Sequence, residues 1–302
     1  MTSLQDKIIA TAREKNAAIY AHTYQPQEIQ EISSVVADSL ELARRSKDGP
    51  ETTIILCGVH FMAESAFILA PHKTILLPNP DAGCPMANMI NEQELLTFKA
   101  QHPGAPVVTY VNSTAAVKAL SDVCCTSANA LAVVKGVPSK EVIFTPDKYL
   151  GSWIQEKLGS EKIIHLYPGF CPTHQRFKEK DVLAMKAAHP SAVTLCHPEV
   201  NPGIRRHADA VMSTSQMIRY AGEHDENEFI ILTEIGIKYP LEKKYPDKKF
   251  YFPDMKVSCP NMKKIALEDV LNSLTYGEHR ITVPEEIREK AFIALDKMLA
   301  YK

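Results

Sequence analysis

Short apolar runs alternate along the whole chain with polar segments that have helical periodicity. The first runs are AAIYAHTY (17–24), APVVTYVN (105–112) and AVTLCHPE (192–199). A second set recurs as TTIILC, EVIFTP and EFIILT, and a third as KTILL, KIIHLY and KKFYF. Strands that alternate with helices predict parallel sheets covered by helices on both faces.

The runs repeat with a period of about 87 residues, and a cysteine followed by proline ends each repeat. Cys84, Cys171 and Cys259 are 87 and 88 residues apart. A repeat at a fixed period indicates that the chain is built from repeated structural units. We expect an α/β fold of three pseudo-threefold-related α/β/α sandwich domains, with parallel sheets around a central active site.

The repeat also predicts the domain boundaries. The first domain comprises residues 1–85 together with 262–302, the second 86–172 and the third 173–261. Residues after 261 break the period and contain two helical patterns, ALEDVLNSLTYG and ITVPEEIREKAFIALDKMLAYK. We expect these two helices to pack on the first domain.

Polar residues also stand in register, meaning 87 or 88 residues apart, at predicted strand ends and helix starts. The strand-end residues are His22, Tyr110 and His197 and, two positions later, Tyr24, Asn112 and Glu199. The helix-start residues are Ser39, Ser127 and Thr214, preceded by Asp38, Thr126 and Ser213. Ligands of parallel α/β sheets bind at this edge.

These residue types suit an anionic ligand. Helix N-termini offer free N–H groups to phosphates and carboxylates, although plain helix capping is the alternative explanation. His197 and Glu199, two apart on one face of a strand, are a candidate acid–base pair. His60 and Glu64, four apart on a helix, are expected to be mainly structural.

Composition narrows the class of protein. The 302 residues carry a net charge of −2, and 45% are hydrophobic, which is enough for a sizeable core. A near-neutral chain gives no reason to expect binding to nucleic acid or a membrane. No apolar run reaches the roughly 18–20 residues that span a bilayer. The polar N-terminal sequence lacks the apolar segment of a signal peptide, so we expect a cytoplasmic protein.

The odd number of cysteines, seven, argues against a disulfide framework in a reducing compartment. No CxxC pair occurs, which excludes a zinc ribbon or a thioredoxin-type motif. Three thiolates that converge from three domains suit a soft metal or an iron–sulfur cluster. Three ligands on a four-iron cluster would leave one iron open as a Lewis acid. A single zinc ion and buried structural cysteines are the alternatives. The cysteines outside the register are Cys57, Cys124, Cys125 and Cys196.

A resemblance to a known family rests on motifs spread over nearly the whole chain. They are AHTYQ (21–25), DSLELA (38–43), CGVHFMAESA (57–66), GCPMAN (83–88), TYVNSTAAVKAL (109–120), CCTSANA (124–130), PGFCPTH (168–174), HPE (197–199), STS (213–215) and SCPNMKK (258–264). With these motifs the chain resembles the quinolinate synthases. That resemblance implies condensation of iminoaspartate with dihydroxyacetone phosphate to quinolinate, with loss of phosphate and water, on the route to NAD. It also implies one 4Fe-4S cluster per chain.

The resemblance carries roles to matching positions. The implied metal ligands are Cys84, Cys171 and Cys259. The implied substrate-binding residues are His22, Ser39, Tyr110, Asn112, Ser127, His197, Glu199, Ser213 and Thr214. The implied catalytic residues are Tyr24, His22, Tyr110, His197 and Glu199. A functional link to the enzyme that supplies iminoaspartate is a further expectation.

The chain departs from the usual family motifs at a few positions, namely Thr23, Asn88, Val200, Met212 and Gln216. None of these departures removes an implied ligand or catalytic group, but Met212 and Gln216 replace the glycines that usually flank the STS motif. Another cluster-dependent hydro-lyase acting on a small diacid and a cluster-based sensor are the alternatives. Activity with the two named substrates would distinguish them.

Overall fold

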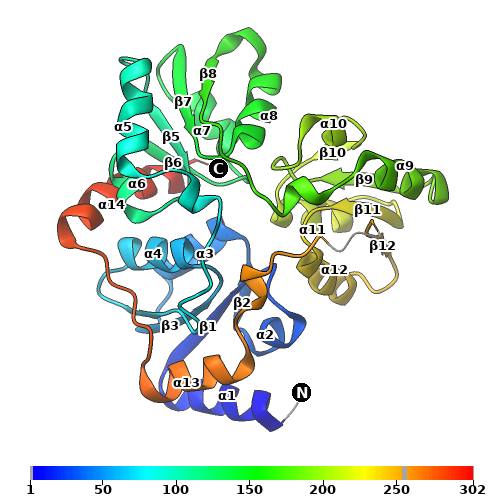
Figure 1. The fold of residues 1–302 in the computed structure, drawn as a ribbon. Helices are drawn as coiled ribbons and strands as arrows, with labels where there is room; N and C mark the ends of the chain where they lie inside the picture. The colour runs from blue at the N-terminus through cyan, green and yellow to red at the C-terminus, as the bar shows by residue number, and fades with distance from the viewer. Residues whose placement is uncertain (1–2, 254–256, 302) are drawn as a thin grey trace.

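The fold consists of three four-stranded parallel sheets that share one strand order. A computed structural model describes residues 3–253 and 257–301. The orders are β2-β1-β3-β4, β6-β5-β7-β8 and β10-β9-β11-β12. Every neighbouring pair within these sheets is parallel. This confirms the predicted fold class of three repeated α/β units, which surround a common centre (Figure 1).

The elements follow the same sequence in each unit. The first unit contains α1 (Ser3–Glu14), β1 (Ala17–His22), α2 (Gln27–Ile32), β2 (Val35–Ala37), α3 (Ser39–Asp48), β3 (Thr53–Cys57), α4 (His60–Leu69) and β4 (Thr74–Leu76). The second contains α5 (Glu92–Gln101), β5 (Val107–Tyr110), α6 (Ala115–Ala119), β6 (Val123–Cys125), α7 (Ala130–Gly136), β7 (Glu141–Thr145), α8 (Lys148–Leu158) and β8 (Ile163–Leu166). The third contains α9 (Glu179–Ala188), β9 (Val193–Cys196), α10 (Pro202–Arg205), β10 (Ala210–Val211), α11 (Thr214–Glu223), β11 (Glu228–Leu232), α12 (Lys238–Lys244) and β12 (Lys249–Tyr251).

One strand of each sheet was not predicted from the sequence. The edge strands β2, β6 and β10 have only two or three residues each, VVA, VCC and AV. The equally short β4 and β12 were predicted because they lie within the longer runs KTILL and KKFYF. The predicted strands, by contrast, are apolar because helices cover both faces of the sheet. Ile54, Ile55 and Leu56 of β3, for example, are at most 1% exposed.

The loops that carry the three Cys-Pro pairs are held by the same backbone contact in every unit. The N–H of His60 donates to the carbonyl of Ala82 at 2.8 Å, and that of Lys148 to Gly169 at 2.9 Å. In the third unit Ile235 donates to Val257, also at 2.9 Å. Each acceptor lies two residues before a cysteine, so the repeat presents all three thiols alike.

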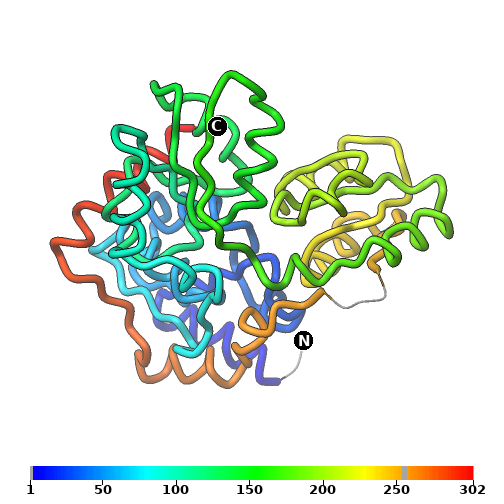
Figure 2. Tube along the Cα trace, turned by 45° about the horizontal axis from the view of Figure 1, so that its top comes forward, coloured from blue at the N-terminus to red at the C-terminus, as the bar shows by residue number. Residues whose placement is uncertain are grey.

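The C-terminal helices connect units. Helix α13 (Leu267–Tyr276) packs on α1 and β3, as expected for the first unit, whereas α14 (Glu285–Leu299) contacts α6 and β6 as well as α4. The red helix in Figure 1 lies beside the second unit, and Figure 2 shows the third unit set apart from it. Between these helices, Ile281 donates to Ile75 at 2.9 Å and extends the edge next to β4. The domain boundaries stay a prediction.

None of the helices within the two described ranges combines the length and apolar character needed to cross a membrane.

Candidate functional site

A cavity lies where the carboxyl ends of the three sheets face one another. The predicted site residues that line it are His22, Tyr24, Ser39, Tyr110, Asn112, Ser127, His197, Glu199 and Thr214, together with Cys84, Cys171 and Cys259. His22 and Tyr110 are the last residues of β1 and β5, and His197 follows β9 directly. The repeat therefore converts positions 87 or 88 residues apart into neighbours around one space.

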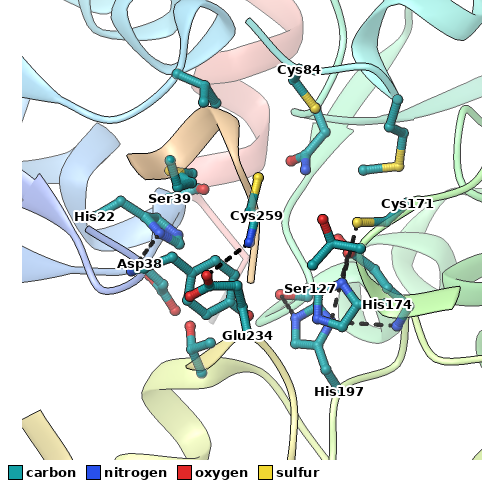
Figure 3. A pocket seen from close by; sticks show the side chains of 18 of the residues that line it. His22, Asp38, Ser39, Cys84, Ser127, Cys171, His174, His197, Glu234 and Cys259 are labelled. Carbon is teal, nitrogen blue, oxygen red and sulfur yellow. Dashed lines mark hydrogen bonds and ion pairs between the residues drawn. The ribbon is translucent and has the colours of Figure 1, made fainter. Parts of the chain in front are cut away.

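Three thiols point into this space from three different units (Figure 3). All three cysteines are partly exposed, whereas Cys57, Cys124, Cys125 and Cys196 are completely buried in or at the ends of strands. Burial raises the pKa of the Cys84 thiol to about 12 and that of Cys171 well above its ordinary value. Such thiols stay protonated unless a metal ion binds and deprotonates them.

Glu199 is the centre of a buried hydrogen-bonded group. The hydroxyl of Tyr110 donates to its Oε1 at 2.6 Å, and Nδ1 of His174 lies 2.7 Å from its Oε2. The predicted partner His197 is farther away, with its Nδ1 4.0 Å from the same oxygen. Burial would raise the pKa of Glu199, but His174 and the hydrogen bonds from His174 and Tyr110 hold it below the ordinary value.

The network continues from His174 to a second tyrosine. Nε2 of His174 lies 2.9 Å from Oγ1 of Thr233, and the hydroxyls of Thr233 and Tyr24 are 2.6 Å apart. Thus Tyr24, Thr233, His174, Glu199 and Tyr110 form one continuous path from the first unit, through the third, to the second. Such a path can transfer protons between groups at opposite sides of the cavity.

Two other histidines are held neutral at the rim. The backbone N–H of Tyr24 donates to Nδ1 of His22 at 3.1 Å, and that of Glu199 to Nδ1 of His197 at 3.4 Å. Because Nδ1 accepts in both rings, the proton of each neutral ring is on Nε2. Burial lowers the pKa of each to about 3. Both imidazoles are thus hydrogen-bond donors through Nε2 rather than cations.

Two of the three predicted helix-start hydroxyls lie at a helix start beside the cavity, Ser39 in α3 and Thr214 in α11. The prediction was wrong for Ser127, which lies in the turn before α7 (Ala130–Gly136) but still lines the cavity. Asp38 caps α3 by accepting from Leu40 and Glu41, which leaves the adjacent Ser39 beside the cavity. Ser127 lies 3.2 Å from Nε2 of His197.

Ser213 is the one predicted site residue that does not line this cavity. Its hydroxyl accepts from the N–H of Gln216 at the start of α11, and it faces a separate hollow with Arg44 and Arg219. Its neighbour Thr214 takes the cavity position instead.

Sequence reasoning missed His174, Thr233 and Glu234. His174 is part of the motif PGFCPTH, three residues after Cys171, but the other two units have no histidine at that position. Its Nδ1 is also 3.2 Å from the Cys171 sulfur. His60, which was expected to be mainly structural, does not line the cavity. Its partner Glu64 accepts a hydrogen bond from the N–H of Ala115 at the start of α6. Glu64 therefore connects the first two units, in line with a structural role.

Comparisons with known proteins agree on one family. A sequence model described as "Quinolinate synthetase A protein" matches residues 6–300. The chain is 49% identical over 298 residues to a quinolinate synthase of Geobacter metallireducens, covering 99% of this chain and 97% of that protein. It is 50% identical over 287 residues to one of Geotalea uraniireducens, covering 95% and 94%. Quinolinate synthase 2 of Methanosarcina acetivorans is 48% identical over 302 residues, with coverage of 98% and 97%.

Proposed function

Since the chain belongs to the quinolinate synthase family, we propose that its central cavity condenses iminoaspartate with dihydroxyacetone phosphate beside an iron–sulfur cluster held by Cys84, Cys171 and Cys259. The observation that carries this proposal is the convergence of three in-register thiols on a cavity lined by titratable and hydroxyl side chains. A cytoplasmic location is part of the proposal.

The spacing of donor atoms favours a cluster over a single ion. Two sulfurs bound to one zinc ion are at most about 4.6 Å apart, twice the Zn–S distance of about 2.3 Å. Among the described residues, the group of candidate ligand atoms within 4.8 Å of one another is Cys171, His174 and Glu199, not the three thiols. A multi-iron cluster separates its thiolates more widely, so the thiols fit a cluster better than zinc.

His174 and Glu199 have other partners in the hydrogen-bonded path, so we assign them to proton transfer rather than to the metal. A four-iron cluster held by Cys84, Cys171 and Cys259 would have one iron without a protein ligand, which would supply Lewis-acid chemistry.

The chain's own residues bind and orient the anionic substrates. The N-termini of α3 and α11 present the positive end of the helix dipole to carboxylates or phosphate. Hydroxyls of Ser39, Ser127 and Thr214 add donors beside them. The neutral rings of His22 and His197 donate through Nε2, which polarises a substrate carbonyl or carboxylate without adding a cation.

Proton transfer is assigned to the path between Tyr24 and Tyr110. Condensation and ring closure remove protons from carbon and nitrogen, and loss of water and phosphate requires protons at oxygen. Glu199 accepts hydrogen bonds from both Tyr110 and His174, so it can take a proton from one side and return it to the other.

Anaerobic assay of quinolinate formation from the two substrates tests the proposal. We expect an oxygen-sensitive brown protein with about four irons per chain. Cys84→Ser, Cys171→Ser and Cys259→Ser should each abolish both iron binding and product formation, and Cys57→Ser serves as the matched control because that thiol is buried in β3. A colourless protein with one zinc per chain would overturn the cluster assignment. A cluster-bearing protein without quinolinate formation would favour another hydro-lyase or a sensor.

A further inference from the structure

Two buried carboxyl groups lie directly beneath the cysteine loops. Asp147 follows β7, Glu234 follows β11, and they are 87 residues apart in the repeat. Both side chains are completely buried, which is costly for a carboxyl group without polar partners. The corresponding residue of the first unit, 88 positions before Asp147, is Val59.

Glu234 makes a direct contact with a cysteine backbone. Its Oε1 accepts from the N–H of Cys259 at 2.9 Å, and its Oε2 accepts from the N–H of Gly236 at 2.7 Å. The ammonium group of Lys263 lies 2.9 Å from Oε1. One carboxyl group therefore joins the end of β11 to the loop that carries the third thiol.

Asp147 occupies the equivalent place in the second unit. Its Oδ1 accepts from Tyr149 and Leu150 at 2.8 and 2.9 Å and so caps α8. Its Oδ2 is buried, and no hydrogen-bond partner for it occurs in the described part of the chain. Burial and Glu199 raise the pKa of Asp147, whereas the backbone N–H groups of Leu150, Tyr149 and Cys171 act in the opposite direction. Asp147 also pairs with Gly169 in an isolated parallel bridge, and the N–H of Lys148 donates to the carbonyl of Gly169 at 2.9 Å. The acid therefore adjoins the Cys171 loop two residues before the cysteine.

We propose that Asp147 and Glu234 are positioning residues that hold the backbone of the Cys171 and Cys259 loops for the metal centre. This inference rests on the proposed function, because it concerns the group that the three thiols bind. Partners that fix metal ligands in place commonly change metal affinity by 10–100-fold when they are removed. The Cys84 loop has Val59 in place of a carboxyl group, so of the two kinds of support it has only the backbone contact between His60 and Ala82.

Helix capping is the competing explanation, and the chain offers variants that separate the two. Asp147→Ser keeps an oxygen that can cap α8 but removes the second oxygen, which is buried and takes no part in the cap. Asp147→Asn and Glu234→Gln keep the size of the side chain and leave a single oxygen acceptor. If capping were the whole role, Asp147→Ser would behave as the wild-type protein.

Matched controls come from a second in-register pair of aspartates at the opposite end of the same sheets. Oδ2 of Asp122 accepts from the N–H of Val107, and Oδ2 of Asp209 accepts from Thr194, both at 2.7 Å. Both residues are exposed and neither lines the cavity. Asp122→Asn and Asp209→Asn therefore alter an acid-to-backbone bond without affecting the cysteine loops.

The experiment measures iron and sulfide per chain after anaerobic reconstitution, the rate of iron loss to a chelator, and the electron paramagnetic resonance spectrum of the reduced protein. We expect Asp147→Ser, Asp147→Asn and Glu234→Gln to lose iron 10–100-fold faster with altered spectra. The two controls should match the wild type, and circular dichroism of the metal-free proteins checks the fold. Folded variants with wild-type iron loss and spectra would overturn the inference. A wild-type protein that binds no iron would instead overturn the proposed function.

Discussion

Glu199 combines deep burial with two close polar partners from different parts of the chain. Its side chain is about 5% exposed, yet Tyr110 and His174 both lie within 2.7 Å of its oxygens. Exchange of one oxygen for an NH2 group keeps the size of the side chain while removing the charge and one acceptor. The residue is therefore suited to separating proton transfer from binding.

We predict that Glu199→Gln lowers turnover by about 10²–10⁴, the usual contribution of general acid–base catalysis. Iron content and quinolinate binding should persist, because neither the thiols nor the helix N-termini are altered. Anaerobic steady-state kinetics and a binding titration provide the measurements. Wild-type turnover in the variant would remove Glu199 from the mechanism.

We predict that Ser127→Ala and Thr214→Ala each weaken binding of quinolinate or dihydroxyacetone phosphate by about 1.5–3 kcal/mol, the value of a hydrogen bond to a charged group. Both residues line the cavity. Ser213→Ala is the comparison, since its hydroxyl caps α11 outside the cavity lining and should affect stability more than affinity. Unchanged affinities in the first two variants would exclude both hydroxyls from ligand binding.

Helix α11 shows how one element connects two units at the cavity rim. The side chain of Gln216 accepts from the N–H of Ser213 at 2.8 Å and completes a capping box. Its amide also donates to the carbonyl of Ala128 in the second unit at 3.3 Å. Gln216 thus caps the start of α11 and also connects it to the loop that carries Ser127.

We predict that Gln216→Ala lowers the free energy of unfolding by about 0.5–2 kcal/mol, the range for loss of a helix cap. Gln216→Glu retains the acceptor for Ser213 but cannot donate to Ala128, so it should lose less stability. Urea denaturation of the metal-free protein measures both. Equal losses in the two variants would mean that the contact between units, rather than the capping box, dominates.

The first two units depend on α14 for part of their assembly. Ala291, Ala294, Leu295 and Met298 are completely buried where the helix crosses from α4 to α6 and β6. The amide of Asn129 donates to the carbonyl of Met298 at 3.0 Å, just behind Ser127 and α7. The last helix therefore supports one wall of the cavity from outside.

We predict that Leu295→Ala destabilises the protein by about 2–5 kcal/mol, as expected for a cavity left in a packed core. Ile293→Ala on the same helix is the control, because Ile293 is 56% exposed and its loss should change stability by about 0.5 kcal/mol or less. Thermal and urea unfolding compare the two. Similar unfolding curves would show that α14 contributes little to the assembly of the units.

The sequence by itself determined the fold class and most of the cavity lining, because both depend on a repeat. Strands of four to six residues with continuous apolar character, such as β1 and β5, are detectable along the chain, and their carboxyl ends place polar residues at one edge. For this reason the sequence predicted His22, Tyr110 and His197 as residues of the cavity. The same holds for the three cysteines that precede proline.

Only the tertiary structure decided the features that occur in a single unit or that have no local signal in the sequence. His174 has no histidine counterpart in the other units, and its distance from Glu199 depends on how two loops of different length fold together. The strands β2, β6 and β10 are short, lie outside the longer apolar runs, and form only because a neighbouring strand is present. Ser213 and Thr214 are adjacent in sequence, but helix geometry turns one into a cap and the other toward the cavity. Such outcomes depend on contacts between distant residues, which no local pattern contains.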